Sequence, residues 1–175
     1  LLQAGIVKQS APRPVRILTR VIRVDDRDSW FEARPGTGNE CFMRYLLDYG
    51  ADGPIGRQSF GLALTPESFC RELAPCRTFM LKQEAEWLLS QGLGRRTTPR
   101  DLLVFDTGGP IDNQLRFPDE CVRHKLLDMV GDLALCGCDF VGRFSAYRSG
   151  HRLNAEMGHH LLNQFPAVER IRSCA

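Results

Sequence analysis

The stretch from Leu115 to Asp132 constrains the fold more than any other part of this chain, because its apolar residues recur at helical spacing. At about 100° per residue they project onto one side, and three polar residues form a stripe on another. The pattern predicts a long central helix, about Asp119 to Cys136, with one face in a core. The apolar face consists of Val122, Leu126, Met129, Val130 and Leu133, and the polar stripe of His124, Asp128 and Asp132.

The polar stripe contains the first candidate ligands for a metal ion. Residues four apart are neighbours on a helix surface, so the imidazole of His124 and the carboxylate of Asp128 can converge on one cation. The spacing is also typical of a solvated pair, and a catalytic zinc site takes about three protein ligands. The spacing alone therefore leaves both interpretations open.

The rest of the chain predicts a single α+β domain with two layers, in which helices pack on one face of a sheet. Residues 1–14 are interpreted as a linker from a missing N-terminal domain, and residues 15–175 as the α+β domain. A small β-α-β insert is expected at about 77–106, with a strand at 77–81, a helix at 84–89 and a strand at 101–106. The other expected strands are 15–24, 30–34, 41–49, 59–64 and 141–148; the other expected helices are 67–73, capped by Thr65, and 151–165.

Composition limits the classes of partner and the compartment. The 175 residues carry a net charge of +2, with 25% charged residues, so nothing demands nucleic acid or an anionic membrane. Seven scattered cysteines without a paired C-x-x-C suit reduced thiols in a cytoplasmic protein. No apolar run reaches the roughly 18 residues of a spanning helix, so stable membrane insertion is not expected.

Two longer motifs, LRFPDECVRHKLLDMVGDLAL at 115–135 and GRFSAYRSGHRLN at 142–154, closely resemble the UDP-3-O-acyl-N-acetylglucosamine deacetylase family. The segments RTF at 77–79, EAEWL at 84–88, QGLG at 91–94 and the opening LLQAGIV are also similar. Members of this family are zinc amidases of lipid A biosynthesis, and each is built from two similar domains. The resemblance here is to the second domain, since the adjacent Glu-His pair that supplies a base and a zinc ligand in the first is absent.

The resemblance implies roles for the polar residues. His124 and Asp128 match two of the three zinc ligands. His151 matches the histidine that stabilises the oxyanion and donates a proton to the leaving amine, and Asp132 is expected to orient it. Thr78 matches a residue near the reacting carbonyl.

The resemblance also implies the substrate contacts. Lys125 and Arg148 match cations that suit a diphosphate. Tyr49 is similar to the aromatic residue that stacks on uracil, with Asp48 at the nucleoside. Phe79 borders the acyl channel, and Ala85 lies in the insert that forms the acyl passage; the alternative is that the insert helix buries Ala85, Leu88 and Leu89 in the core.

The expected function is therefore half of a zinc-dependent amide hydrolase site. It would deacetylate UDP-3-O-acyl-N-acetylglucosamine to the free amine and acetate, and would be complete only with the N-terminal domain. The alternative is a non-catalytic module that binds the nucleotide or the acyl chain.

Overall fold

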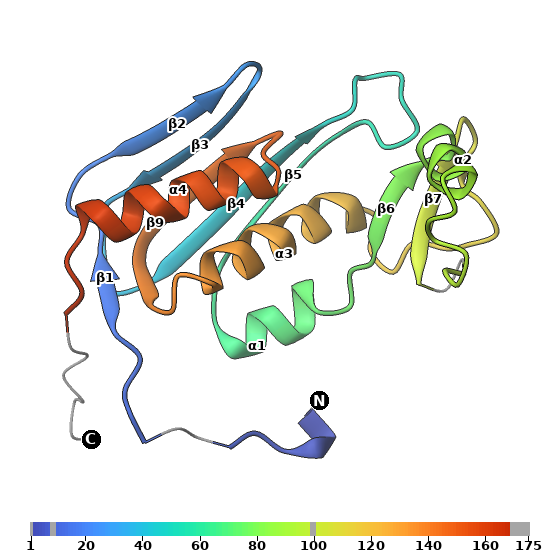
Figure 1. The fold of residues 1–175 in the computed structure, drawn as a ribbon. Coiled ribbons are helices and arrows are strands. Elements are labelled where there is room, and N and C mark those ends of the chain that lie inside the picture. The colour runs from blue at the N-terminus through green and yellow to red at the C-terminus, as the bar shows by residue number, and fades with distance from the viewer. Residues whose placement is uncertain (1, 8–9, 99–100, 169–175) are drawn as a thin grey trace.

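The computed structural model describes residues 2–7, 10–98 and 101–168, and a six-stranded mixed sheet forms its main layer (Figure 1). The strand order is β2-β3-β9-β4-β5, and β1 pairs in parallel with β9. A short 3-10 helix, η1, comes first. The bounds are η1 Leu2–Ala4, β1 Val15–Ile17, β2 Ile22–Asp26, β3 Ser29–Arg34, β4 Cys41–Asp48, β5 Arg57–Ala63 and β9 Asp139–Tyr147.

Two helices, α3 (Glu120–Ala134) and α4 (His151–Gln164), cover one face of this sheet side by side (Figure 1). The helix α3 lies over β4 and β5, and α4 lies over β2 and β3. The α+β class and the helices on one face are confirmed. The apolar face predicted for the central helix is in the core, with Val122, Leu126, Met129 and Leu133 at most 2% exposed.

The strands β4 and β9 run in parallel, and this register positions the site. Residue pairs run from Cys41 beside Gly142 to Leu46 beside Tyr147. Because the carboxyl ends of parallel strands meet at one edge of a sheet, the residues after β4 and those after β9 lie close together. That edge carries Tyr49 and Arg148.

The single strand predicted over 15–24 is wrong, because the structure divides it between two partners. β1 pairs with the first three residues of β9, whereas β2 forms an antiparallel hairpin with β3. The change of partner falls beside Gly142, where a Cβ atom would lie 2.9 Å from the Arg34 carbonyl oxygen and 2.9 Å from Leu18 Cδ2. Alternation along one strand carries no signal for such a close approach.

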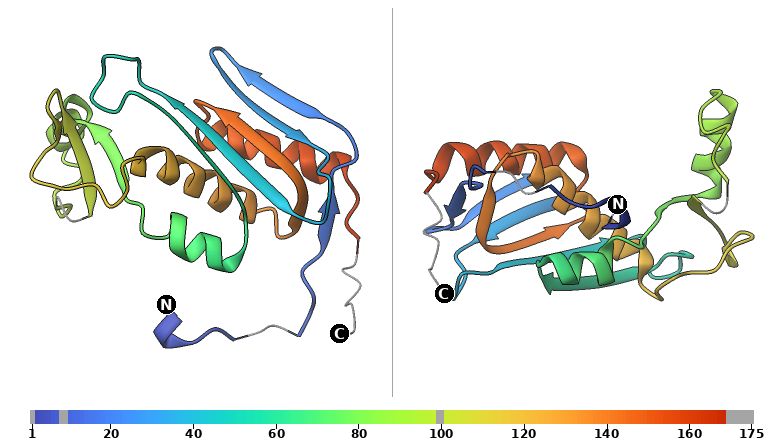
Figure 2. Two further views of the ribbon diagram at one scale, coloured as in Figure 1. Left: turned by 180° about the vertical axis from the view of Figure 1, so that it is seen from behind. Right: turned by 90° about the horizontal axis from the view of Figure 1, so that it is seen from below.

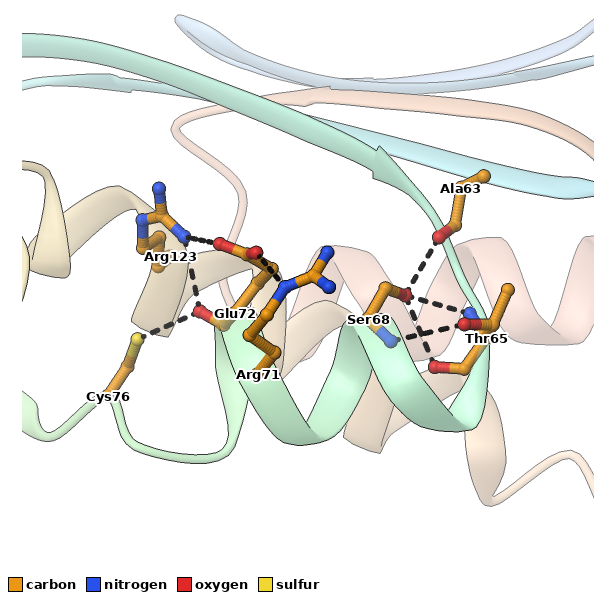
Figure 3. Close-up of polar contacts among 7 residues, drawn as sticks. All are labelled: Ala63, Thr65, Ser68, Arg71, Glu72, Cys76 and Arg123. Carbon is orange, nitrogen blue, oxygen red and sulfur yellow. Dashed lines mark hydrogen bonds and ion pairs between the residues drawn. The ribbon is translucent and has the colours of Figure 1, made fainter.

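The helix predicted over 67–73 begins as expected but winds differently. Thr65 Oγ1 accepts from Ser68 N (3.1 Å) and Thr65 N donates to Ser68 Oγ (2.9 Å), a reciprocal cap (Figure 3). After α1 (Pro66–Ser68) the chain continues as a wider π-helical segment, η2 (Phe69–Leu73). Arg123 of α3 holds this segment through an ion pair with Glu72 (2.6 Å; Figure 3).

The predicted β-α-β insert is present as β6 (Thr78–Leu81), α2 (Lys82–Ser90) and β7 (Leu102–Asp106), with β6 and β7 parallel. A short strand, β8 (Gly109–Pro110), pairs with β7. The right-hand view of Figure 2 shows α2 standing away from the main layers. Every residue of α2 keeps some exposure, and Leu89 is 54% exposed, so the alternative of a helix buried in the core is wrong.

Candidate functional site

A pocket of about 810 Å³ opens where β4 and β9 end, beside α3 and β6. Eight of the eleven residues predicted for the site line it. They are Asp48, Tyr49, Thr78, Phe79, His124, Lys125, Asp128 and Arg148.

His124 and Asp128 face each other across one turn of α3. His124 Nε2 lies 3.3 Å from Asp128 Oδ1, and the two side chains are 13% and 18% exposed. Burial lowers the pKa of His124 below its usual value, and the charge of Asp128 opposes that shift in part. The imidazole is therefore neutral at neutral pH, which is the form that coordinates a metal ion. Of the polar stripe, His124 and Asp128 line the pocket, whereas Asp132 lies outside its lining.

The second oxygen of the Asp128 carboxylate is held by Lys125. Lys125 Nζ donates to Asp128 Oδ2 at 2.9 Å and lies 5.9 Å from the centre of the Tyr45 ring. Lys125 is only 19% exposed, so its charge is directed into the pocket wall rather than into open solvent. This contact fixes the carboxylate while Oδ1 faces His124.

His151 and Asp132 form a second couple, outside the lining of the pocket. The carboxylate of Asp132 lies 2.9 and 3.0 Å from His151 Nδ1. Asn154, which sequence reasoning missed, is 1% exposed and donates from Nδ2 to Asp132 Oδ2 at 2.8 Å. The spacing of His151 and Asn154 along α4 places both over the same residue of α3.

The carboxylate of Asp48 accepts hydrogen bonds from three donors within the protein. It accepts from Tyr147 Oη (2.7 Å), Gly50 N (2.9 Å) and Arg57 Nε (3.0 Å). The hydrogen bond from Tyr147 contributes most to lowering the pKa of Asp48 to about 2. Asp48 thus holds the start of the loop that carries Tyr49.

Aromatic rings connect that loop to the helix. Tyr49 and Phe79 meet edge to face with centroids 5.8 Å apart, and Phe79 meets the His124 ring in the same way at 6.1 Å. Tyr49 is 39% exposed and Phe79 is 8% exposed. One wall of aromatic rings therefore runs from the partly exposed ring of Tyr49 to His124.

A further predicted residue lies outside the lining of this pocket, and the lining includes residues that were not predicted. Ala85 is half-buried on α2 and is not part of the pocket wall, because the insert helix stands away from the main layers (Figure 2). Arg57, which sequence reasoning missed, lines the pocket together with Tyr45 and Ser149. Arg57 lies directly opposite Asp48 in the β4–β5 register, a pairing that strand alignment could have revealed.

A buried ion pair joins α3 to the start of β6. Glu120 and Arg77 have side chains 0% and 9% exposed, and Arg77 Nε donates to Glu120 Oε1 at 2.9 Å. Burial alone would raise the pKa of Glu120, but hydrogen bonds from Arg77 and from the backbone of Arg116 outweigh it and hold the pKa below its usual value. Glu120 lies one turn before His124 and Arg77 directly before Thr78, so the pair connects both sides of the pocket.

The described residues supply two candidate metal ligands at this point, His124 and Asp128. Across residues 2–7, 10–98 and 101–168 there is no group of three or more His, Cys, Asp or Glu side chains that could hold an ion. In the same part of the chain, no helix has the length and apolarity needed to cross a membrane.

The fold and the pocket define an α+β domain whose His–Asp pair suits a metal ion, beside cationic and aromatic walls. The family model described as UDP-3-O-acyl N-acetylglycosamine deacetylase matches residues 1–163. The chain belongs to this family.

Curated relatives named UDP-3-O-acyl-N-acetylglucosamine deacetylase support this membership. The relative from Chlamydia felis (strain Fe/C-56) is 40% identical over 163 residues, which cover 93% of this chain and 58% of the relative. The relative from Brucella ovis (strain ATCC 25840 / 63/290 / NCTC 10512) is 41% identical over 172 residues, 97% of this chain and 59% of the relative. The chain thus spans somewhat more than half the length of these two relatives.

Proposed function

We propose that this chain supplies half of the active site of a zinc-dependent deacetylase, which releases acetate from UDP-3-O-acyl-N-acetylglucosamine in lipid A biosynthesis. The observation that carries the proposal is the His124–Asp128 pair inside a pocket lined by three cations. Family membership supports the reaction class. The cations are Lys125, Arg148 and Arg57.

The donor set fits zinc. One imidazole nitrogen and one carboxylate oxygen are typical zinc ligands, and two ligands at normal bond lengths on a tetrahedral ion lie about 3.4 Å apart. His124 Nε2 and Asp128 Oδ1 are 3.3 Å apart without rearrangement. A zinc ion held there would supply Lewis acidity toward the amide carbonyl and toward a water molecule.

The remaining chemistry falls to a proton donor and to groups that orient the substrate. Water adds to the acetyl carbonyl, the C–N bond breaks, and the leaving amine needs a proton. We assign that proton, and stabilisation of the oxyanion, to His151, with Asp132 holding the ring through Nδ1. Thr78 would lie near the reacting carbonyl.

Substrate recognition follows from the character of the pocket walls. Cationic side chains suit a diphosphate, so we assign it to Lys125 and Arg148, with Arg57 as a further cation near the loop. The half-exposed ring of Tyr49 suits stacking on uracil, and Phe79 suits the start of the acyl chain. Asp48 would act mainly by holding the loop.

We place the third zinc ligand and the general base in a further domain, which corresponds to the part of the relatives that this chain does not span. Two ligands are too few for a catalytic zinc site, so the chain alone should bind zinc weakly. A cytoplasmic location belongs to the same proposal. The six described cysteines are free thiols, which suits a reducing compartment.

Metal and nucleotide titrations test the proposal. Zinc added to the dialysed 175-residue chain should bind weakly, and the binding should disappear in His124→Ala and in Asp128→Ala but persist in His159→Ala. UDP should bind the wild-type chain and bind more weakly to Lys125→Ala. Tight zinc binding that ignored His124 would contradict the assigned ligands.

The alternative, a non-catalytic module for a nucleotide or an acyl chain, has one observation in its favour. The described part of the chain offers two metal ligands, not three. A non-catalytic module predicts that zinc does not change the affinity for UDP, and that no longer form of the protein releases acetate.

A further inference from the structure

The corner between β9 and α4 has an unusual backbone. Arg148 has φ of 50°, in the left-handed region that residues with a side chain rarely adopt. Such a conformation persists only where the surroundings hold it, and it clusters at functional sites. The corner ends two residues later at Gly150, which precedes His151, the first residue of α4.

Three hydrogen bonds from neighbouring elements hold this corner. Arg148 N donates to the carbonyl of Leu46, at 3.1 Å. Ser29 Oγ donates to the Arg148 carbonyl at 3.0 Å, and Tyr45 Oη donates to the Ser149 carbonyl at 2.5 Å. The corner is thus fixed from β4 and from the β2–β3 hairpin rather than from its own residues.

Tyr45 makes the buried contact of the three. Its side chain is 1% exposed, and Ser149 is 3% exposed. The hydroxyl of Ser149 has no hydrogen-bond partner within the described residues, whereas the Ser149 carbonyl accepts from Tyr45 Oη. Gly150 has no side chain that could cap α4.

The direction of α4 at its first turn decides whether His151 reaches Asp132. His151 is exposed, with 72% of its side chain open, so packing does not fix its ring. Its place depends on the backbone that precedes it and on its bond to Asp132. A corner that could move would let the ring leave that carboxylate.

We propose that Tyr45 is a positioning residue for His151, acting through the Ser149 carbonyl to hold the left-handed corner that aims the first turn of α4 at Asp132. The kinetic part of this inference rests on the proposed function. Tyr45 also lines the pocket, yet its hydroxyl is directed at the backbone of the corner.

Tyr45→Phe, made in the full-length protein with both domains, tests the inference because it removes one hydroxyl and keeps the ring. We expect kcat per bound zinc to fall about tenfold or more, with KM and zinc stoichiometry within about twofold of wild type. Rates are compared well below the melting temperature of each variant, so that loss of folded protein does not enter.

The matched control is Tyr147→Phe, which removes a hydroxyl from the neighbouring strand. That hydroxyl donates to Asp48, so its loss should raise KM for the nucleotide substrate rather than lower kcat. Ser29→Ala removes an outer hydrogen bond of the same corner and should lower kcat by a smaller factor than Tyr45→Phe. Equal kcat in Tyr45→Phe and wild type would overturn the kinetic role.

A second arm does not depend on activity. In the 175-residue chain, Tyr45→Phe should speed amide hydrogen exchange at Arg148 and Asn154 by about tenfold or more, and Tyr147→Phe should not. Unchanged exchange would overturn the inference even if the enzyme were active. Faster exchange, together with a wild-type enzyme that releases no acetate, would sustain the corner's dependence on Tyr45 and refute the proposed function instead.

Discussion

At the scale of residues, two His–Asp couples have different surroundings and therefore suit different tasks. His124 and Asp128 are mostly buried in the pocket, where a neutral imidazole and a fixed carboxylate suit metal coordination. His151 is largely exposed and contacts Asp132 through Nδ1, which suits a group that exchanges protons.

This difference predicts separable effects in the full-length protein. His151→Ala should lower kcat by about 10²–10⁴, as loss of a general acid or oxyanion partner does, with zinc content near wild type. Asp128→Ala should lower zinc content and rate together. Zinc stoichiometry and acetate release, measured on the same samples, distinguish the two; a His151→Ala enzyme that had lost its zinc would contradict the assignment.

Asp48 provides a prediction about pH. Its folded-state pKa of about 2 lies below the usual value of about 4, so it stabilises the fold above that usual value and loses this contribution as the pH falls toward 2. Because Tyr147 contributes most to the shift, Tyr147→Phe should move the pKa of Asp48 upward. Carboxyl carbon NMR titration measures it, and an unmoved pKa would be evidence against this hydrogen bond.

Sequence and family resemblance predicted residues on regular elements that line the pocket, such as His124 and Asp128 on one helix face. They missed Arg57, Tyr45 and Asn154. Each of these acts across a strand or helix contact, through the Asp48–Arg57 register, the corner carbonyl, or the α3–α4 packing. Such contacts depend on tertiary placement, which local spacing does not encode.

At the scale of elements, one face of α3 packs in the core and contributes stability, and another face lines the pocket and carries the proposed chemistry. Leu126 is 0% exposed in the core, so Leu126→Ala should lower the free energy of unfolding by about 2–5 kcal/mol. Asp128→Ala, on the pocket side, should cost much less. Urea denaturation of both variants measures this; equal losses would mean that the polar stripe is structural.

The ion pair between Glu120 and Arg77 should be the strongest polar interaction between α3 and the start of β6. Glu120→Ala leaves Arg77 buried without its partner and should cost about 3–5 kcal/mol. Asp106→Ala breaks the exposed ion pair with Lys82 and should change stability little, since solvent screens such pairs. Thermal unfolding of both variants compares them, and a stable Glu120→Ala protein would contradict the role given to the pair.

Element prediction succeeded where periodicity was long and failed where the backbone deviates locally. The central helix and the parallel strands of the insert follow from apolar spacing and turn residues. The division of the first strand depends on the close approach of Leu18 to Gly142. The wide turn of η2 depends on the hydrogen bond from Ala74 N to the carbonyl of Phe69, five residues earlier. Neither feature leaves a repeat in the sequence.

At the scale of the whole molecule, the proposed active site is divided between two domains. This chain would provide two ligands, the proton donor and the cationic wall, and the further domain would provide the third ligand and the base. This chain spans 58% and 59% of the two relatives, and the proposed further domain corresponds to the rest of their length.

The most direct test is acetate release from UDP-3-O-acyl-N-acetylglucosamine with zinc present, for the 175-residue chain alone and for the same chain joined to the region that the relatives carry in addition. We predict no measurable release by the chain alone, and turnover by the joined protein that zinc chelation abolishes. Substantial turnover by the bare chain, or a joined protein whose rate does not depend on Asp128 and His151, would contradict the division of the site.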